Sequence, residues 1–135
     1  MALSKEKTKI LLSIVDRAMH QFLTERDHLH SIVSTSDDVQ SVNVMINKKT
    51  LSCLEFRELA EVREVDEEFI DFMHTDSFNF ILKLVDDDIE NLNNQSKSLV
   101  ACDKLTSTSA IEAINTHITV LESIKSELRS MFSYF

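Results

Sequence analysis

The 135-residue sequence contains neither glycine nor proline. Without glycine, turns that need a positive φ angle are costly, and tight β-hairpins depend on such turns. Without proline, no residue blocks the backbone of a long helix. The missing glycine also excludes the glycine-rich phosphate loop, the dinucleotide-binding turn and the nucleophile elbow of hydrolases in their usual form. The two absences together predict an all-α fold.

Cysteines and long apolar runs are also scarce. Cys53 and Cys102 are the only cysteines, and we interpret them as small buried residues of a reducing compartment. No apolar run approaches the roughly 20 residues that a membrane-spanning helix needs. The N-terminal segment lacks the small-residue cleavage site of a signal peptide. These features predict a cytoplasmic protein with no membrane partner.

Positive charge is scarce in the middle of the chain. The whole sequence has a net charge of −9, and residues 51–90 hold thirteen acidic residues against three basic ones. This stretch therefore accounts for the entire excess of negative charge. Direct binding to a nucleic-acid backbone or to an anionic membrane is disfavoured, whereas a basic segment of another protein is a suitable partner.

The last segment, residues 107–135, has the clearest helical pattern. Its apolar residues recur every three or four positions, as in a helix with one buried stripe. Ser109 and Glu112 have the spacing of a capping box, so the helix is expected to begin there. The stripe consists of Ile111, Ile114, Ile118, Leu121, Ile124, Leu128, Met131 and Phe135.

A first helix is predicted over residues 4–33, with Ser4 as its cap. Residues 37–47 are ambiguous, because their apolar residues alternate like those of a strand for which the chain offers no partner. We interpret them as a short helix or a packed connection. Residues 47–50 are expected to form a polar turn.

A second helix is predicted from a capping box at Ser52 and Glu55 to about Met73. One apolar stripe runs through this whole segment without interruption. Its expected buried side consists of Phe56, Leu59, Val62, Val65, Phe69 and Phe72 or Met73.

A third helix is predicted over residues 77–104, with a break near residue 94 as the alternative. Two of the three connections between the four long segments are then short, and short connections make neighbouring helices antiparallel. The expected fold is an antiparallel up-down four-helix bundle with a longer first crossover at residues 34–51. No linker or repeat is visible, so residues 1–135 are expected to form one domain.

The predicted second helix also carries a row of acidic residues spaced three or four positions apart. Such spacing places them on one helix face, about 5 Å apart along the axis. One interpretation is a solvated face that keeps the protein soluble. The other is a docking surface for a basic segment of another protein. The row consists of Glu58, Glu61, Glu64, Glu68 and Asp71.

Two patterns suggest chemistry but compete with simpler explanations. Glu25 and His28 form the E-x-x-H pair of carboxylate-bridged metal bundles, and Asp71 with His74 is a weaker match. The two pairs fall at opposite ends of the expected bundle, so we interpret them as surface residues. Cys53 has no histidine beside it in the sequence, so a buried structural role is favoured over catalysis.

Aromatic and large apolar residues crowd the C-terminus: Met131, Phe132, Tyr134 and Phe135. One stripe would bury only some of them, and exposed aromatic neighbours suggest a contact with another chain. The alternatives are a homodimer formed through these ends, or a monomer in which they cover one end of the core.

The sequence thus predicts a small acidic α-helical protein that binds another protein and is not an enzyme. Adaptors, inhibitors, immunity proteins and secretion-chaperone-like factors belong to this class. No cofactor or nucleic-acid partner is expected. The alternative is a ferritin-like metal-binding bundle that uses Glu25 and His28.

Overall fold

The computed structural model describes residues 2–32, 37–102 and 105–132. Within them the chain forms five α-helices and no strand, apart from an isolated antiparallel bridge between Ala2 and Asp66. The prediction of an all-α fold is therefore confirmed. The helices are α1 (Lys5–Ile32), α2 (Asp37–Val62), α3 (Glu67–Phe72), α4 (Thr75–Cys102) and α5 (Leu105–Phe132).

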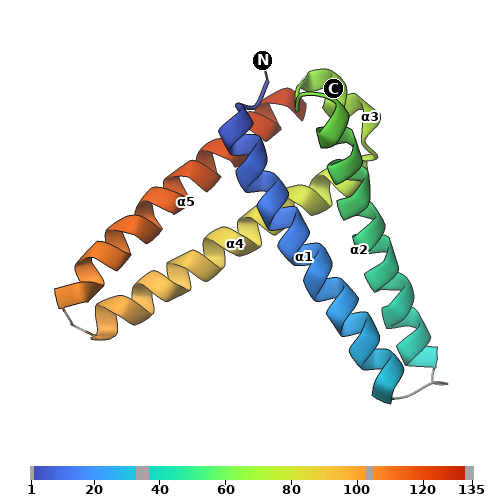
Figure 1. The fold of residues 1–135 in the computed structure, drawn as a ribbon, viewed down its shortest axis with the longest axis horizontal. Coiled ribbons are helices and arrows are strands. Elements are labelled where there is room, and N and C mark those ends of the chain that lie inside the picture. The colour runs from blue at the N-terminus through green and yellow to red at the C-terminus, as the bar shows by residue number, and fades with distance from the viewer. Residues whose placement is uncertain (1, 33–36, 103–104, 133–135) are drawn as a thin grey trace.

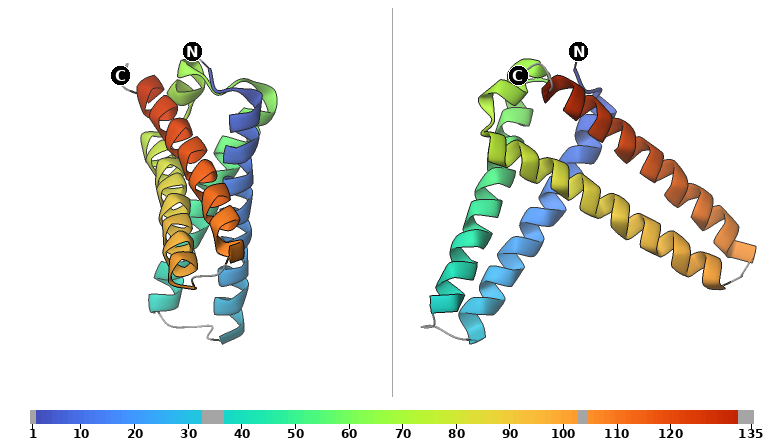
Figure 2. Two further views of the ribbon diagram at one scale, coloured as in Figure 1. Left: turned by 90° about the vertical axis from the view of Figure 1, so that its left-hand side faces the viewer. Right: turned by 180° about the vertical axis from the view of Figure 1, so that it is seen from behind.

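The four long helices are arranged as two antiparallel hairpins, α1 with α2 and α4 with α5 (Figure 1). The hairpins meet at one end of the molecule and diverge, so that their far ends point away from each other (Figures 1 and 2). The short helix α3 and both ends of the described chain lie where the hairpins meet.

The hydrophobic core sits at this joined end. Leu11 and Val15 of α1, Phe56 of α2 and Leu121 of α5 are all fully buried in it. Towards the far ends the hairpins have separated, and Ile111 and Ile114 are only half-buried. The remaining predicted stripe of α5 is buried from Ile118 to Met131, as expected.

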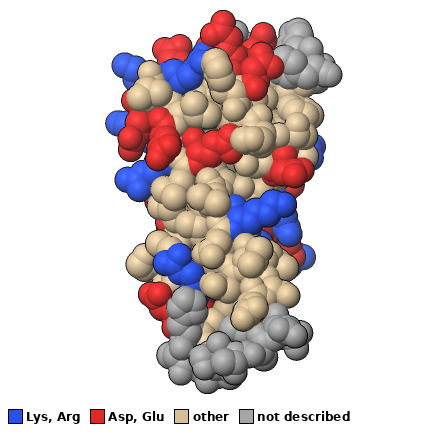
Figure 3. All heavy atoms as spheres, turned by 90° about the vertical axis from the view of Figure 1, so that its right-hand side faces the viewer, with Lys and Arg blue, Asp and Glu red and all other residues tan. Residues whose placement is uncertain are grey.

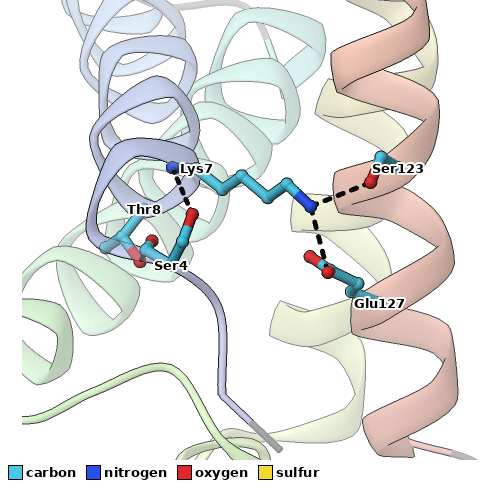
Figure 4. A network of polar contacts seen from close by, with 5 residues as sticks. All are labelled: Ser4, Lys7, Thr8, Ser123 and Glu127. Carbon is cyan, nitrogen blue, oxygen red and sulfur yellow. Dashed lines mark hydrogen bonds and ion pairs between the residues drawn. The ribbon is translucent and has the colours of Figure 1, made fainter.

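Ion pairs and hydrogen bonds add polar links between the hairpins. The Lys7 ammonium of α1 donates to the hydroxyl of Ser123, at 2.9 Å, and pairs with Glu127, at 3.0 Å (Figure 4). Both partners lie on α5. Ser4 caps α1 as predicted, because its hydroxyl oxygen accepts from the Lys7 amide at 3.2 Å.

The predicted crossover at residues 34–51 is wrong, because α2 already begins at Asp37. Residues 37–47 are helical, and the expected polar turn at 47–50 is part of the same helix. The polar side chains there bond to their own helix: Thr50 donates to the Ile46 carbonyl and Ser52 to the Lys48 carbonyl. Ser52 is therefore not a helix cap.

The predicted second helix over residues 52–73 is also wrong, because the helix breaks after Val62. Asp66 caps the new helix α3, with its carboxylate accepting from the Phe69 amide at 2.9 Å. The Val65 carbonyl, which a continuous helix would have used, accepts instead from the Leu3 amide at 2.8 Å. The N-terminal segment thus satisfies the backbone that the break exposes.

Of the predictions for the last two helices, one is confirmed and one is wrong. Helix α4 is a single helix through residue 94, as predicted, and the Ser98 hydroxyl donates to the Asn94 carbonyl there; the helix begins at Thr75, two residues before the predicted start. Helix α5 begins at Leu105, so Ser109 and Glu112 lie inside it and do not form the predicted capping box. In both cases the chain has no glycine or proline to end the helix.

Candidate functional site

The five acidic residues of the predicted row are all exposed, but they do not share one helix face. Glu58 and Glu61 lie on α2, Glu64 lies in the connection, and Glu68 and Asp71 lie on α3. The one-face prediction is wrong because the helix breaks between them. Figure 3 nevertheless shows acidic side chains gathered over one end of the face that α2 and α3 present.

Two of the five acids are engaged within the chain. Glu61 pairs with Arg57 at 3.6 Å, and Glu68 pairs with Arg63 at 2.9 Å. Glu58, Glu64 and Asp71 have no ion-pair partner among the described residues. Within the row, the charge of these three carboxylates is uncompensated.

Large apolar side chains are exposed beside these acids. Val62 is 79% exposed, Phe72 66% and Leu51 65%. They line a surface groove of about 620 Å³, whose walls are Leu51, Leu54, Glu55, Glu58, Leu59 and Val62 on α2 and Phe72 on α3. Apolar side chains rimmed by charged ones are typical of a protein-binding surface. We call this feature the α2 groove.

The sequence pattern had placed Val62, and Phe72 or Met73, in the core; Met73 is buried, whereas Val62 and Phe72 are exposed. Val62 lies on the side of α2 opposite its buried residues, and Phe72 follows the break, while Val65 and Phe69 are fully buried. A missed signal lay in the sequence: Asp66 followed by Glu67 and Glu68 is a typical helix start, with a capping residue and acids in the first turn. The apolar period continues through this helix start without a gap, and it therefore predicted one continuous helix.

The wall formed by Phe72 is held in place by Arg63. The guanidinium lies over the Phe72 ring, 5.1 Å from its centre. The same guanidinium bonds Asp66 at 3.3 Å and Glu68 at 2.9 Å, so it ties the end of α2 to the start of α3. These contacts fix one end of the α2 groove.

Beside the α2 groove, the start of α4 is fastened to α2. The Glu55 carboxylate accepts from the His74 amide at 3.3 Å and lies 3.0 Å from the His74 ring nitrogen Nδ1. The Ser77 hydroxyl donates to that of Ser52 at 3.2 Å. The groove therefore lies on a face of α2 whose position is set by contacts with α4.

The suggested metal ligands are not brought together. Glu25 and His28 are exposed on the last part of α1, whereas Asp71 is exposed on α3 and His74 pairs with Glu55. Within the described ranges no three His, Cys, Asp or Glu side chains are arranged to hold a metal ion.

Cys53 is a free and fully buried thiol. Burial, with a smaller effect from the Asp16 carboxylate, raises the pKa of Cys53 to about 11. The thiol is therefore protonated at neutral pH, and the thiolate needed for nucleophilic attack is disfavoured. The side chain of Cys102 lies outside the described residues.

At the C-terminus, the described apolar residues pack within their own chain. Met131 is fully buried, and the Phe132 ring stacks on Phe78 of α4 with ring centres 4.8 Å apart. Tyr134 and Phe135 lie outside the described residues. Of the predicted self-association residues, Met131 and Phe132 thus already have partners in the core.

A second cleft lies between the diverging hairpins, with a volume of about 640 Å³. Arg17 of α1 and Asp88 of α4 flank it and pair with each other at 3.5 Å. The remaining walls are mostly amide and hydroxyl side chains of α4. It lacks the exposed apolar anchors of the α2 groove, so it is the weaker candidate for binding a protein.

The sequence matches no protein-family model, and comparisons with curated proteins and with solved structures gave no match. Among the described residues, every helix is too short or too polar to span a lipid bilayer.

Proposed function

We propose that this chain is a small acidic α-helical protein–protein interaction module that acts by binding and not by catalysis. The observation that carries the proposal is the exposure of Val62 and Phe72 beside uncompensated carboxylates on α2 and α3. An adaptor, an inhibitor, an immunity protein or a secretion-chaperone-like factor would use such a surface. A reducing cytoplasm suits its free, buried thiol.

The two parts of this surface have different tasks in binding. The apolar side chains supply affinity, because apolar area removed from water contributes roughly 25 cal/mol per Å². The carboxylates of Glu58, Glu64 and Asp71 supply attraction at a distance, which raises the association rate for a basic partner. A partner with basic residues around an apolar patch fits both parts.

The proposal takes the two hairpins as halves of one antiparallel four-helix bundle domain over residues 1–135. Its support is the continuous core, which includes residues from α1, α2, α3, α4 and α5. A domain of this kind unfolds in a single cooperative transition. Urea unfolding followed by circular dichroism, with Phe fluorescence as a second probe, is expected to give coincident curves.

Affinity capture from a native extract, followed by kinetic measurement with the purified partner, tests the function. Neutralising the three uncompensated acids (Glu58→Gln, Glu64→Gln, Asp71→Asn) is expected to slow association several-fold and to weaken its dependence on salt. Glu112→Gln with Glu122→Gln, at exposed positions of α5, is the matched control and should leave the rate unchanged.

An association rate that is the same in the triple variant and the wild type would contradict the proposal. The acids would then form only a solvated face. Glu61 and Glu68 are left intact in this experiment, because changing them would also disturb Arg57 and Arg63.

A further inference from the structure

The α2 groove has the residue spacing of a helix-packing face. Its lining on α2 is formed by Leu51, Leu54, Glu55, Glu58, Leu59 and Val62. The steps of three, one, three, one and three residues follow one side of a helix for about three turns. At about 1.5 Å per residue the stripe is roughly 16 Å long. Such a stripe is the surface against which another helix packs.

This stripe is separate from the side of α2 that the chain covers itself. Ile46, Thr50, Cys53 and Phe56 are buried, and they lie on the other side of the helix from Leu51 and Val62. Helix α2 therefore has two apolar sides, and the described residues cover only one of them. Phe72 closes the open side at the α3 end.

The charge around the α2 groove indicates what covers it. Glu58 stands in the lining without an ion-pair partner among the described residues. The exposed Glu64 and Asp71 are close in the sequence to Val62 and Phe72, which mark one end of the groove. A second copy of this chain would bring the same carboxylates against each other, which is unfavourable. Basic side chains would satisfy them.

We infer that the α2 groove binds one amphipathic helix of a partner protein, about three turns long, with bulky apolar residues at i, i+3 or i+4, and i+7, flanked by Lys or Arg. This inference rests on the proposed function, and it specifies the chemical character of the partner. An apolar side chain of that helix lies between Val62 and Phe72, and its basic residues face Glu58 and the acids near α3.

An extended peptide fits this surface less well. Extended segments bind by adding a strand to an exposed sheet edge, and in the part of the chain described here there is no sheet. On the surface of a helix, the side chains form ridges and grooves into which the side chains of another helix pack regularly. An extended peptide does not match this spacing.

Selection of 16-residue peptides from a fully randomised displayed library tests the inference. The wild-type protein is the bait, and Val62→Asn with Phe72→Ser is used for counter-selection. The selected peptides are expected to share apolar residues at helical spacing and an excess of Lys and Arg. Their synthetic forms should become helical on binding, measured by circular dichroism, and a central proline should weaken binding at least tenfold.

Variants of the protein locate the binding site. Val62→Asn and Phe72→Ser are each expected to weaken binding of the selected peptides about tenfold, which corresponds to about 1.4 kcal/mol. Val100→Asn is the matched control, because Val100 is 64% exposed on α4, away from the α2 groove. It should bind the peptides as the wild type does. Thermal unfolding of all three verifies that they are folded.

Four results would overturn the inference. The selection yields no peptide, or the selected peptides are acidic. Alternatively, the peptides tolerate a central proline, or they bind Val62→Asn as tightly as the wild type. If the selected peptides are basic but lack helical spacing, and their binding still needs Glu58 and Asp71, the helical form of the partner is refuted. The proposed function is not affected by that result. A different result contradicts the proposed function: the captured natural partner associates with the triple variant at the same rate as with the wild type. A stable dimer that is lost in Val62→Asn would assign the groove to a second copy and refute the inference.

Discussion

The guanidinium of Arg63 lies over the ring of Phe72, 5.1 Å from its centre, across the break between α2 and α3. The two residues would be more than two turns apart on a continuous helix. Their contact exists because α2 ends at Val62 and α3 begins anew at Glu67, and Arg63 also bonds Asp66 and Glu68. The same break places Phe72 at the end of the α2 groove, whose other walls all lie on α2.

The break predicts different effects of the same substitution at two valines. Val65 is fully buried, so Val65→Ala is expected to lower the free energy of unfolding by about 2 kcal/mol. Val62 is 79% exposed, so Val62→Ala should change it by less than about 0.5 kcal/mol. Urea unfolding at 25 °C measures both. Equal losses would indicate the continuous helix that the apolar period alone suggests.

The capping bond of Asp66 is expected to stabilise α3 measurably. Asp66→Ala removes the acceptor for the Phe69 amide and should cost about 1 kcal/mol. Asp66→Asn keeps an oxygen at the same place and should cost less, although it loses the charge that pairs with Arg63. If the two variants have the same stability in urea unfolding, the capping bond contributes nothing.

Cys53 should make stability fall at high pH. Below pH 9 its thiol is protonated in both states and has no effect. Between pH 9 and pH 11 the unfolded thiol releases its proton, whereas the folded one, with its pKa raised to about 11, retains it. Unfolding is then favoured by up to about 1.4 kcal/mol per pH unit.

The comparison with Cys53→Ala isolates this effect, because all other titrating groups are common to both proteins. The stability advantage of the wild type over the variant, measured by urea unfolding at pH 8 and pH 10.5, should shrink at the higher pH. An advantage that is independent of pH would mean that the thiol titrates normally in the folded protein.

Self-association through the C-terminus stays a prediction, and the structure changes how it is tested. Phe132 stacks on Phe78, so replacing Phe132 would weaken the core as well as any interface. Tyr134→Ser with Phe135→Ser leaves that stack in place. We expect light scattering to show a dimer for the wild type at micromolar concentrations and a monomer for the double variant. A monomeric wild type would refute the dimer, and a dimer that persists in the variant would place its interface elsewhere.

The sequence by itself determined the helical class and most of the long helices. With no glycine or proline to stop them, α1, α4 and α5 follow their apolar periods, and the buried face of α5 was predicted from Ile118 to Met131. These features are local, because a helix satisfies its own backbone and its stripe needs only some apolar surface to cover it.

Only the tertiary structure determined which residues of the apolar stripe from Phe56 to Phe72 are buried. The period runs unbroken from Phe56 to Phe72, yet Val62 and Phe72 face solvent while Val65 and Phe69 are in the core. Leu3 contributes to the break, because its amide donates to the Val65 carbonyl from more than sixty residues away. No local pattern contains that contact. A helix break in a chain without glycine or proline is favourable only when distant groups satisfy the backbone it exposes.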